Sequence, residues 1–156
     1  MLKKKKGFSL IELLLVLSLI GMIVAITVNF SMHNKDRWSL RDTAREITST
    51  YYQAKQRASR ENASVRLDVG AKGYAFYRDN AGAWEILKSE TYPEKITGSS
   101  TANFLIHPSG FIIDPTTLKI AGSQTITLTA PRGAYIDSMT ITIYPYGGLR
   151  VEKAFK

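Results

Sequence analysis

The sequence opens with an apolar run that is long enough to cross a membrane. From Phe8 to Phe30 nearly every side chain is apolar, and as a helix this run would extend roughly 34 Å at about 1.5 Å per residue. The hydrocarbon core of a bilayer is about 30 Å thick. The block Lys3–Lys6 precedes the run, and such basic residues stay on the cytoplasmic side. We therefore expect a single-pass protein of the inner (cytoplasmic) membrane, with its N-terminus cytoplasmic and its C-terminal domain extracytoplasmic.

Two ordinary explanations of this segment fit less well. A secretory signal peptide has an apolar region of about 7–15 residues and a small-x-small cleavage site, whereas this run is longer and residues 22–33 contain no A-x-A pattern. A plain signal anchor explains the lysines and the length, but it does not explain Glu12. A charge at the centre of a membrane helix costs roughly 2.5–3.5 kcal/mol, and less near the interface. Such a carboxylate is usually retained because it has a partner.

A third interpretation accounts for the glutamate as well. The lysine block is followed by the segment Gly7-Phe8-Ser9-Leu10-Ile11-Glu12, which resembles the class III leader of type IV prepilins and pseudopilins. In that family a membrane prepilin peptidase cuts after the glycine and methylates the new amino terminus. The resemblance implies cleavage between Gly7 and Phe8, N-methylation of Phe8, and a role for Glu12 in filament assembly. There the carboxylate would supply the counter-charge that a buried ammonium of a neighbouring subunit needs.

A second pattern extends the helix beyond the apolar run. Apolar or small residues recur at alternating spacings of four and three, which is one face of a helix. They are Leu40, Ala44, Ile47, Tyr51, Ala54 and Ala58. Polar residues fill the positions between them, and Asn62 is the expected stop. We interpret residues 31–62 as an amphipathic helix half that lies on a soluble domain.

Beyond residue 62 the pattern changes to the period of two that is typical of strands. The turn sequence Asp79-Asn80-Ala81-Gly82 indicates a hairpin, and the polar segment 89–102 is expected to form a loop. Strands are expected at 65–69, around 74–76, and at 84–87, 103–106, 111–113, 125–129, 139–144 and 149–153.

These patterns together predict an α+β fold, in which a long N-terminal helix packs on an antiparallel β-sheet or sandwich. The expected organisation has four parts. They are the leader peptide 1–7, the transmembrane helix half 8–30, the amphipathic helix half 31–62 and the β-rich soluble domain 63–156.

The soluble part carries a second, looser resemblance. The pattern Phe104-x-x-x-Pro108-x-Gly110 and the later segment Gly147-Gly148-Leu149-Arg150-Val151 resemble the H-type minor pseudopilins of type II secretion, the FimT-type minor pilins and related competence pseudopilins. Several members end in Gly-Arg-x-Arg, and here only Arg150 of that pattern remains. The resemblance implies a structural subunit, with other pilin or pseudopilin subunits as partners. It would prime or tip a filament of a type II secretion, pilus or DNA-uptake machine.

Residue patterns that carry catalysis are missing from the sequence. It has no cysteine and no H-E-x-x-H, G-x-S-x-G or P-loop motif, and His33 and His107 are far apart in the chain. The segment that begins at Asp79 lacks the D-x-[DN]-x-[DN] core of a calcium loop. We therefore expect no enzyme activity, no cofactor, no metal site and no small-molecule substrate.

The alternative function is DNA binding by the soluble domain. The formal net charge is +8, but four of the 21 basic residues lie in the lysine block, which leaves 17 basic against 13 acidic residues elsewhere. A mildly basic body is weak support for nucleic-acid binding, and lysines are also common on solvated edge strands. A structural role is favoured. The candidate DNA contacts are Arg132, Arg150, Lys153 and Lys156.

Overall fold

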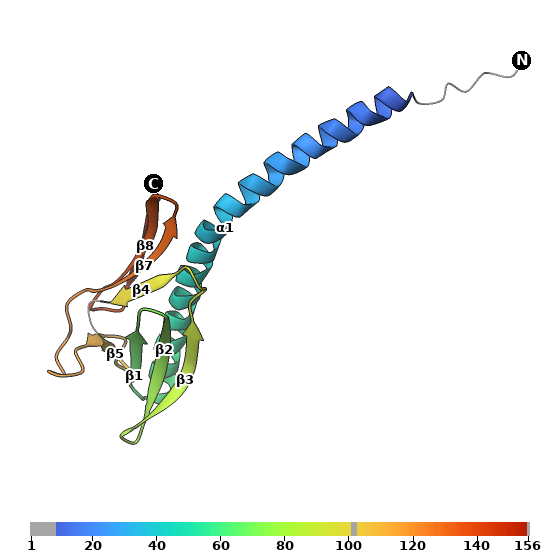
Figure 1. Ribbon diagram of the computed structural model, residues 1–156. Coiled ribbons are helices and arrows are strands. Elements are labelled where there is room, and N and C mark those ends of the chain that lie inside the picture. Colours follow the sequence, from blue (N-terminus) through green and yellow to red (C-terminus); the bar gives the residue numbers. More distant parts are fainter. Residues whose placement is uncertain (1–8, 101–102, 156) are drawn as a thin grey trace, which may run out of the picture. The chain divides into compact units, whose positions relative to one another are not determined.

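The computed structural model describes residues 9–100 and 103–155, apart from the side chains of residues 29–34 and 132 (Figure 1). A long helix is followed by antiparallel strands, so the predicted α+β fold is confirmed. In chain order the elements are α1 (Leu10–Glu61), β1 (Val65–Val69), β2 (Gly73–Asn80), β3 (Ala83–Thr91), β4 (Thr97–Ser100), β5 (Phe104–Ile106), β6 (Ile112–Ile113), β7 (Gln124–Arg132), β8 (Tyr135–Ile143) and β9 (Leu149–Ala154).

The chain divides into two compact units, residues 1–35 and 36–156. In the described part of the first unit, the stretch Leu10–Val28 of α1 has a mean hydropathy of 2.7 and none of it is buried. Among the described residues it is the one stretch of helix that is long and apolar enough to span a membrane. Length and composition thus agree with the expected membrane segment.

In the second unit, the predicted face of α1 is buried in the core. All six of its residues, from Leu40 to Ala58, are at most 5% exposed, which confirms the helical phase read from the spacing. The helix ends at Glu61, and Asn62 follows with a φ of +49°. The amide of Ala63 donates to the carbonyl oxygen of Ala58 at 3.2 Å. Asparagine tolerates this left-handed conformation at a helix end, so it caps α1 where the sequence predicts a stop.

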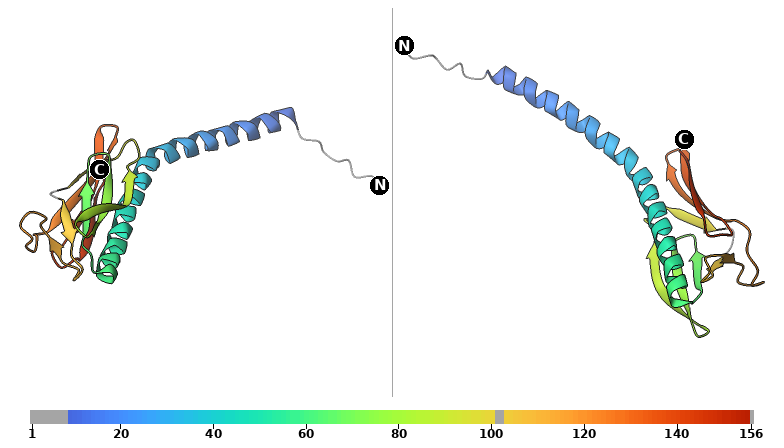
Figure 2. Two further views of the ribbon diagram at one scale, coloured as in Figure 1. Left: turned by 90° about the horizontal axis from the view of Figure 1, so that it is seen from below. Right: turned by 180° about the vertical axis from the view of Figure 1, so that it is seen from behind.

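The strands form two antiparallel sheets (Figure 2). The first has the order β3-β2-β1-β5-β6, and the second has the order β4-β7-β8-β9. Phe76 and Phe104 of the first sheet and Ile126 and Ile141 of the second belong to the same buried cluster as the inner face of α1. One hydrophobic core therefore holds the helix and both sheets together.

The hairpin predicted at residues 79–82 is confirmed. It joins β2 to β3, and the backbone amide of Gly82 donates to Oδ1 of Asp79 at 2.8 Å. Ala81 and Gly82 have φ values of +53° and +92°. Positive φ at both central residues gives the type of turn that matches the twist of the flanking strands.

The prediction of a loop over residues 89–102 is wrong. β3 continues to Thr91, and β4 pairs with β7 through the register Thr97↔Thr129. The residue of β4 that faces inward is Gly98, and a Cβ there would collide with the ring of Tyr92. β4 therefore has no alternating apolar side chains. It is held by backbone pairing with β7, and the Tyr92 ring fills the space beside Gly98.

The hairpin of β7 and β8 is longer than predicted. Its register runs from Gln124↔Ile143 to Arg132↔Tyr135, so both strands extend toward their common turn beyond the expected ranges. Pro131 and the buried Asp137 interrupt the apolar alternation in this extension. The extra residues are held by pairing between the two strands rather than by an apolar pattern.

A close contact joins two distant segments of the chain at Gly147. Its φ is +73°, and a Cβ at this position would collide with the carbonyl oxygen of Gly110 and with Nζ of Lys55. The amide of Ile112 donates to the carbonyl oxygen of Pro145 at 2.8 Å beside it. The two segments that carry the looser sequence resemblance thus lie together, and glycine is required where they meet.

Candidate functional site

The start of α1 carries the carboxylate that the sequence singled out. The helix begins at Leu10, and the amide of Leu13 donates to the carbonyl oxygen of Ser9 at 3.1 Å. Glu12 therefore lies in the first turn, where an acidic side chain is stabilised by the helix dipole. Gly7 and Phe8, the expected cleavage and methylation positions, lie outside the described residues.

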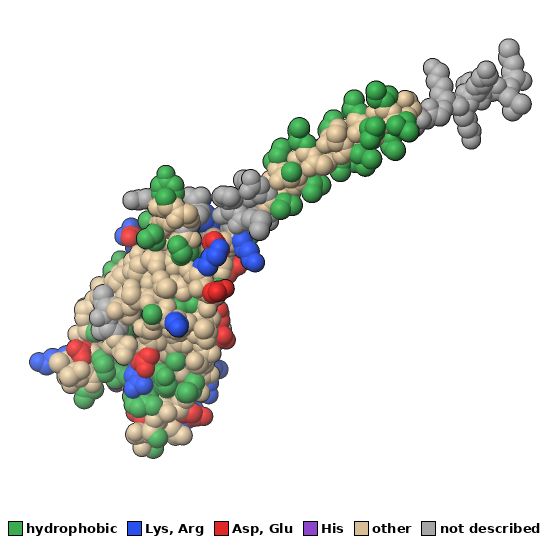
Figure 3. All heavy atoms as spheres, in the orientation of Figure 1, with side chains coloured by type: hydrophobic (Ala, Val, Ile, Leu, Met, Phe, Trp, Pro, Cys, Tyr) green, Lys and Arg blue, Asp and Glu red, His purple; other side chains and the backbone are tan. Residues whose placement is uncertain are grey.

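Glu12 differs from the other polar groups of the apolar stretch. The hydroxyl of Ser18 donates to the carbonyl oxygen of Leu15, and that of Thr27 donates to the carbonyl oxygen of Ile23, each at 2.8 Å. Those groups are satisfied within the helix. Within the described ranges, by contrast, Glu12 makes no ion pair. Apolar side chains are exposed along this stretch of helix from Leu10 to Val28, and Figure 3 shows them along its surface. A carboxylate in such surroundings can form an ion pair with a cation on another chain.

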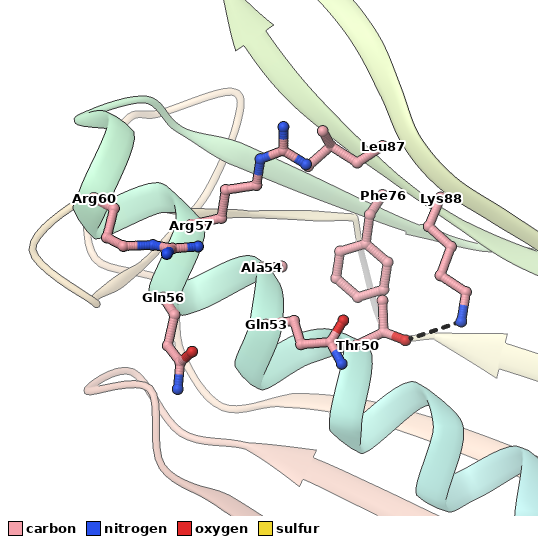
Figure 4. A pocket seen from close by; sticks show the side chains of 9 residues that line it. All are labelled: Thr50, Gln53, Ala54, Gln56, Arg57, Arg60, Phe76, Leu87 and Lys88. Carbon is pink, nitrogen blue, oxygen red and sulfur yellow. Dashed lines mark hydrogen bonds between the residues drawn. The ribbon is translucent and has the colours of Figure 1, made fainter.

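In the second unit a groove runs along one side of α1 (Figure 4). It has a volume of about 330 Å³ and is lined by Thr50, Gln53, Ala54, Gln56, Arg57, Arg60, Phe76, Leu87 and Lys88. Lys88 donates to Oγ1 of Thr50 at 3.4 Å and to the Glu46 carboxylate at 2.7 Å. The Lys88 hydrogen bond lowers the pKa of Glu46, and the same bond raises the pKa of Lys88. These groups stabilise each other and hold α1 to β3.

A second groove lies between α1 and β9. Its volume is about 360 Å³, and Met139 and Val151 contribute apolar surface to it. The basic residues Arg41, Arg45 and Lys153 line the same groove. Two of them, the helix arginines, were not singled out from the sequence. Their i,i+4 spacing beside the buried face of the helix is the signal that could have identified them.

The structure does not gather the candidate DNA contacts into one patch. Arg150 pairs across the sheet with Thr142 and Lys153 with Met139, so the two basic side chains point to opposite faces of β9. Arg150 forms an ion pair with Glu152 at 2.8 Å.

The other two candidates add no described side chain to that region. The backbone of Arg132 lies at the turn end of β7 and its side chain is outside the description, as is the whole of Lys156. In the part of the chain that is described, no group of three or more His, Asp or Glu residues is placed to hold a metal ion.

Comparisons with known proteins find similarity to the N-terminal segment and, separately, to the fold. Residues 2–28 match the family model of the prokaryotic N-terminal methylation motif. The matched range includes Gly7, Phe8 and Glu12. No curated protein sequence matches the chain significantly.

Solved structures resemble the chain over about three quarters of its length. The minor pseudopilin EpsH from the type 2 secretion system of Vibrio cholerae matches at 12% identity with a TM-score of 0.60, covering 74% of this chain and 97% of EpsH. A second EpsH structure matches at 11% identity and a TM-score of 0.57, with coverages of 76% and 96%. The type IV minor pilin FimU of Pseudomonas aeruginosa matches at 14% identity and a TM-score of 0.56, with coverages of 75% and 90%.

The chain therefore combines an N-terminal methylation motif with a fold similar to those of the minor pseudopilin EpsH and the minor pilin FimU.

Proposed function

We propose that this chain is a minor pilin or pseudopilin, a structural subunit made as a membrane precursor and built into a type IV pilus-like filament. The observation that supports this most is the methylation motif on residues 2–28 at the head of a pseudopilin-like fold. In this proposal the subunit primes or tips the filament of a type II secretion, pilus or DNA-uptake machine.

Processing by a prepilin peptidase is the first step of the proposed role. The lysine block keeps the N-terminus in the cytoplasm, cleavage follows Gly7, and Phe8 becomes the methylated first residue. Mass spectrometry of protein from its native membrane should find a chain that starts at methylated Phe8. Gly7→Leu should remain uncut. Gly21→Leu is the matched control, because a Cβ at Gly21 meets nothing within 4 Å. An intact precursor in cells that contain the peptidase would refute this step.

Assembly is the second step, and it depends on Glu12. The carboxylate has no ion-pair partner among the described residues, so the ammonium of Phe8 in a neighbouring subunit is its proposed partner. Glu12→Ala should be cleaved normally and yet fail to co-purify with filaments. Ser18→Ala should be incorporated, because that hydroxyl is satisfied within its own helix. Normal incorporation of Glu12→Ala would rule out the charge pair.

DNA binding by the soluble domain is the alternative function. The observation that favours it is the basic groove lined by Arg41, Arg45 and Lys153. Contacts would be to phosphates, so binding would be insensitive to sequence and weaken steeply with salt. Neutralising Arg41, Arg45 and Lys153 together should lower the salt slope by about one per lost phosphate contact. An anisotropy titration that shows no binding at about 50 mM salt would remove this alternative.

A further inference from the structure

Exposed apolar and aromatic side chains gather at one end of the second unit. Trp38 of α1 is 56% exposed, and Tyr135 and Ile136 at the start of β8 are 56% and 63% exposed. Pro131 and Ala134, next to them at the hairpin turn, are exposed too. The hairpin tip, defined here as Pro131, Ala134, Tyr135 and Ile136, thus presents exposed apolar and aromatic side chains.

Two contacts place this tip at the end of the unit where the chain enters it. Arg37, one residue after the unit begins at Asp36, donates to Asp137 at 2.8 Å. Lys55, about 27 Å further along the helix, donates to the carbonyl oxygen of Gly147. β8 therefore runs alongside α1 in the same direction. Its first residue, Tyr135, lies roughly 7 Å before Asp137 at about 3.3 Å per residue.

Cationic side chains surround the same end. Lys95 is exposed and donates to Oδ2 of Asp36 at 3.0 Å. The guanidinium groups of Arg37 and Arg41 lie over the ring of Phe155, with 5.3 Å and 5.0 Å between Cζ and the ring centroid. Tryptophan and tyrosine are enriched at the boundary between lipid and water, and basic residues near it are attracted to anionic lipids.

The length of chain between this end and the apolar stretch is short. Val28 ends the stretch and Asp36 begins the second unit, and eight residues of helix extend only about 12 Å. The headgroup layer adds roughly 5–7 Å to each side of the hydrocarbon core. A tip that extends from this end of the unit is therefore within reach of lipid headgroups.

We propose that the hairpin tip docks on the surface of the bilayer that holds the apolar stretch, with Tyr135 and Ile136 seated among phospholipid headgroups. The tip and Trp38 form a second membrane contact of the unassembled subunit. This inference rests on the proposed membrane insertion of the chain. A neighbouring protein subunit is the competing occupant, and the experiment below excludes it by using one copy in lipid alone.

The test uses the full chain in nanodiscs of phosphatidylcholine and phosphatidylglycerol, with one copy per disc. The sequence contains no cysteine, so a bimane label on Ile136→Cys is unique. A lipid with a nitroxide on its headgroup should quench this label. Tyr146→Cys is the matched control, since Tyr146 is 75% exposed and lies in the turn that contacts Lys55. Its fluorescence should be retained.

Two further samples separate the possible failures. A label on Leu17→Cys reports whether the apolar stretch lies in the bilayer, through quenching by a lipid with a nitroxide on its acyl chain. If that label is not quenched, the membrane insertion itself is refuted. If it is quenched but the labels at positions 136 and 146 behave alike, only the docking is overturned.

The apolar character of the contact is tested with a label on Ala134→Cys. Headgroup quenching of this label should be lost when Tyr135→Asp and Ile136→Asp are introduced together. Both side chains are exposed, so the fold should tolerate the change. Quenching that persists unchanged would mean that the short helical connection to the apolar stretch is enough to keep the tip near lipid. That result would overturn the proposal.

Discussion

Arg37 and Asp137 form an ion pair that joins α1 to β8 across a hundred residues of sequence. Nε of Arg37 donates to Oδ2 of Asp137 at 2.8 Å, and Nη2 donates to Oδ1 at 3.4 Å. The hydrogen bond to Asp137 raises the pKa of Arg37 above its ordinary value. The Asp137 side chain is 2% exposed. The pair thus fastens the start of β8 to the part of α1 that begins the second unit.

Removing this carboxylate should destabilise the second unit. Asp137→Ala takes away the acceptor of two guanidinium hydrogen bonds, and the expected loss in the free energy of unfolding is about 1–3 kcal/mol. Urea denaturation of residues 36–156 measures it. Asp42→Ala is the control, because Asp42 and Arg45 are both exposed and 3.7 Å apart. Equal midpoints for the two variants would contradict the role of the pair.

Ile47 of α1 should tolerate a charge poorly. It is fully buried, and Ile47→Asp would place a carboxylate without a partner in the core, at an expected cost of about 3 kcal/mol or more. The measurement is thermal unfolding of the same fragment. Gln56→Asp, on the exposed side of the helix, should leave the transition almost unchanged. An unaltered transition for Ile47→Asp would disprove the helical phase.

Tyr51→Phe should stabilise the protein. The Tyr51 hydroxyl is buried and has no hydrogen-bond partner in the described part of the chain, so removing it should gain about 1 kcal/mol. Tyr52→Phe, at the neighbouring exposed position, should have little effect. Denaturant titrations of the two variants at neutral pH compare them directly. A lower midpoint for Tyr51→Phe would indicate that the hydroxyl does have a partner.

The same residue predicts a sensitivity to alkali. Burial raises the pKa of Tyr51 to about 12, with a smaller contribution from Tyr52. The folded state therefore favours the neutral phenol. The contribution of Tyr51 to the free energy of unfolding is therefore fully present below the unfolded pKa of about 10. It is lost as the pH rises toward 12. Tyr51→Phe should weaken this loss and not abolish it, since burial also raises the pKa of Tyr92 to about 12.

Glu46 predicts a sensitivity to acid. Because the Lys88 hydrogen bond lowers the pKa of Glu46, the pair stabilises the fold above the unfolded glutamate pKa of about 4.3. This contribution is lost as the pH falls through the folded value. Both side chains are partly exposed, so Glu46→Gln should cost less than about 1 kcal/mol at neutral pH. Unfolding should then depend less on pH below about pH 4. Glu94→Gln is the exposed control, and an identical acid profile for both variants would contradict the assignment.

Much of the helix could be predicted because its signals are local. The spacing from Leu40 to Ala58 follows from 3.6 residues per turn, and the structure buries that face as expected. Asn62 ends the helix in a conformation that its own side chain tolerates. The β2–β3 hairpin is equally local, since its turn lies within Asp79–Gly82.

The parts that sequence reasoning missed depend on contacts between distant residues. β4 has no apolar pattern, because Gly98 faces inward under the ring of Tyr92. The extension of β7 and β8 contains Asp137, whose burial becomes intelligible only when Arg37 is placed beside it. Likewise, the opposite orientation of Arg150 and Lys153 follows from strand register, and a count of basic residues near the C-terminus cannot show it.

The position of α1 at the start of the chain has a consequence for the order in which the core is completed. The helix face from Leu40 to Ala58 belongs to the hydrophobic core, and it precedes every strand of the described chain. During synthesis this face is made before the strands that cover it. β8, which brings Ile141 into the core, follows more than 70 residues after the helix ends. The complete core can therefore form only after the last strands have been made, well after the helix face that they cover.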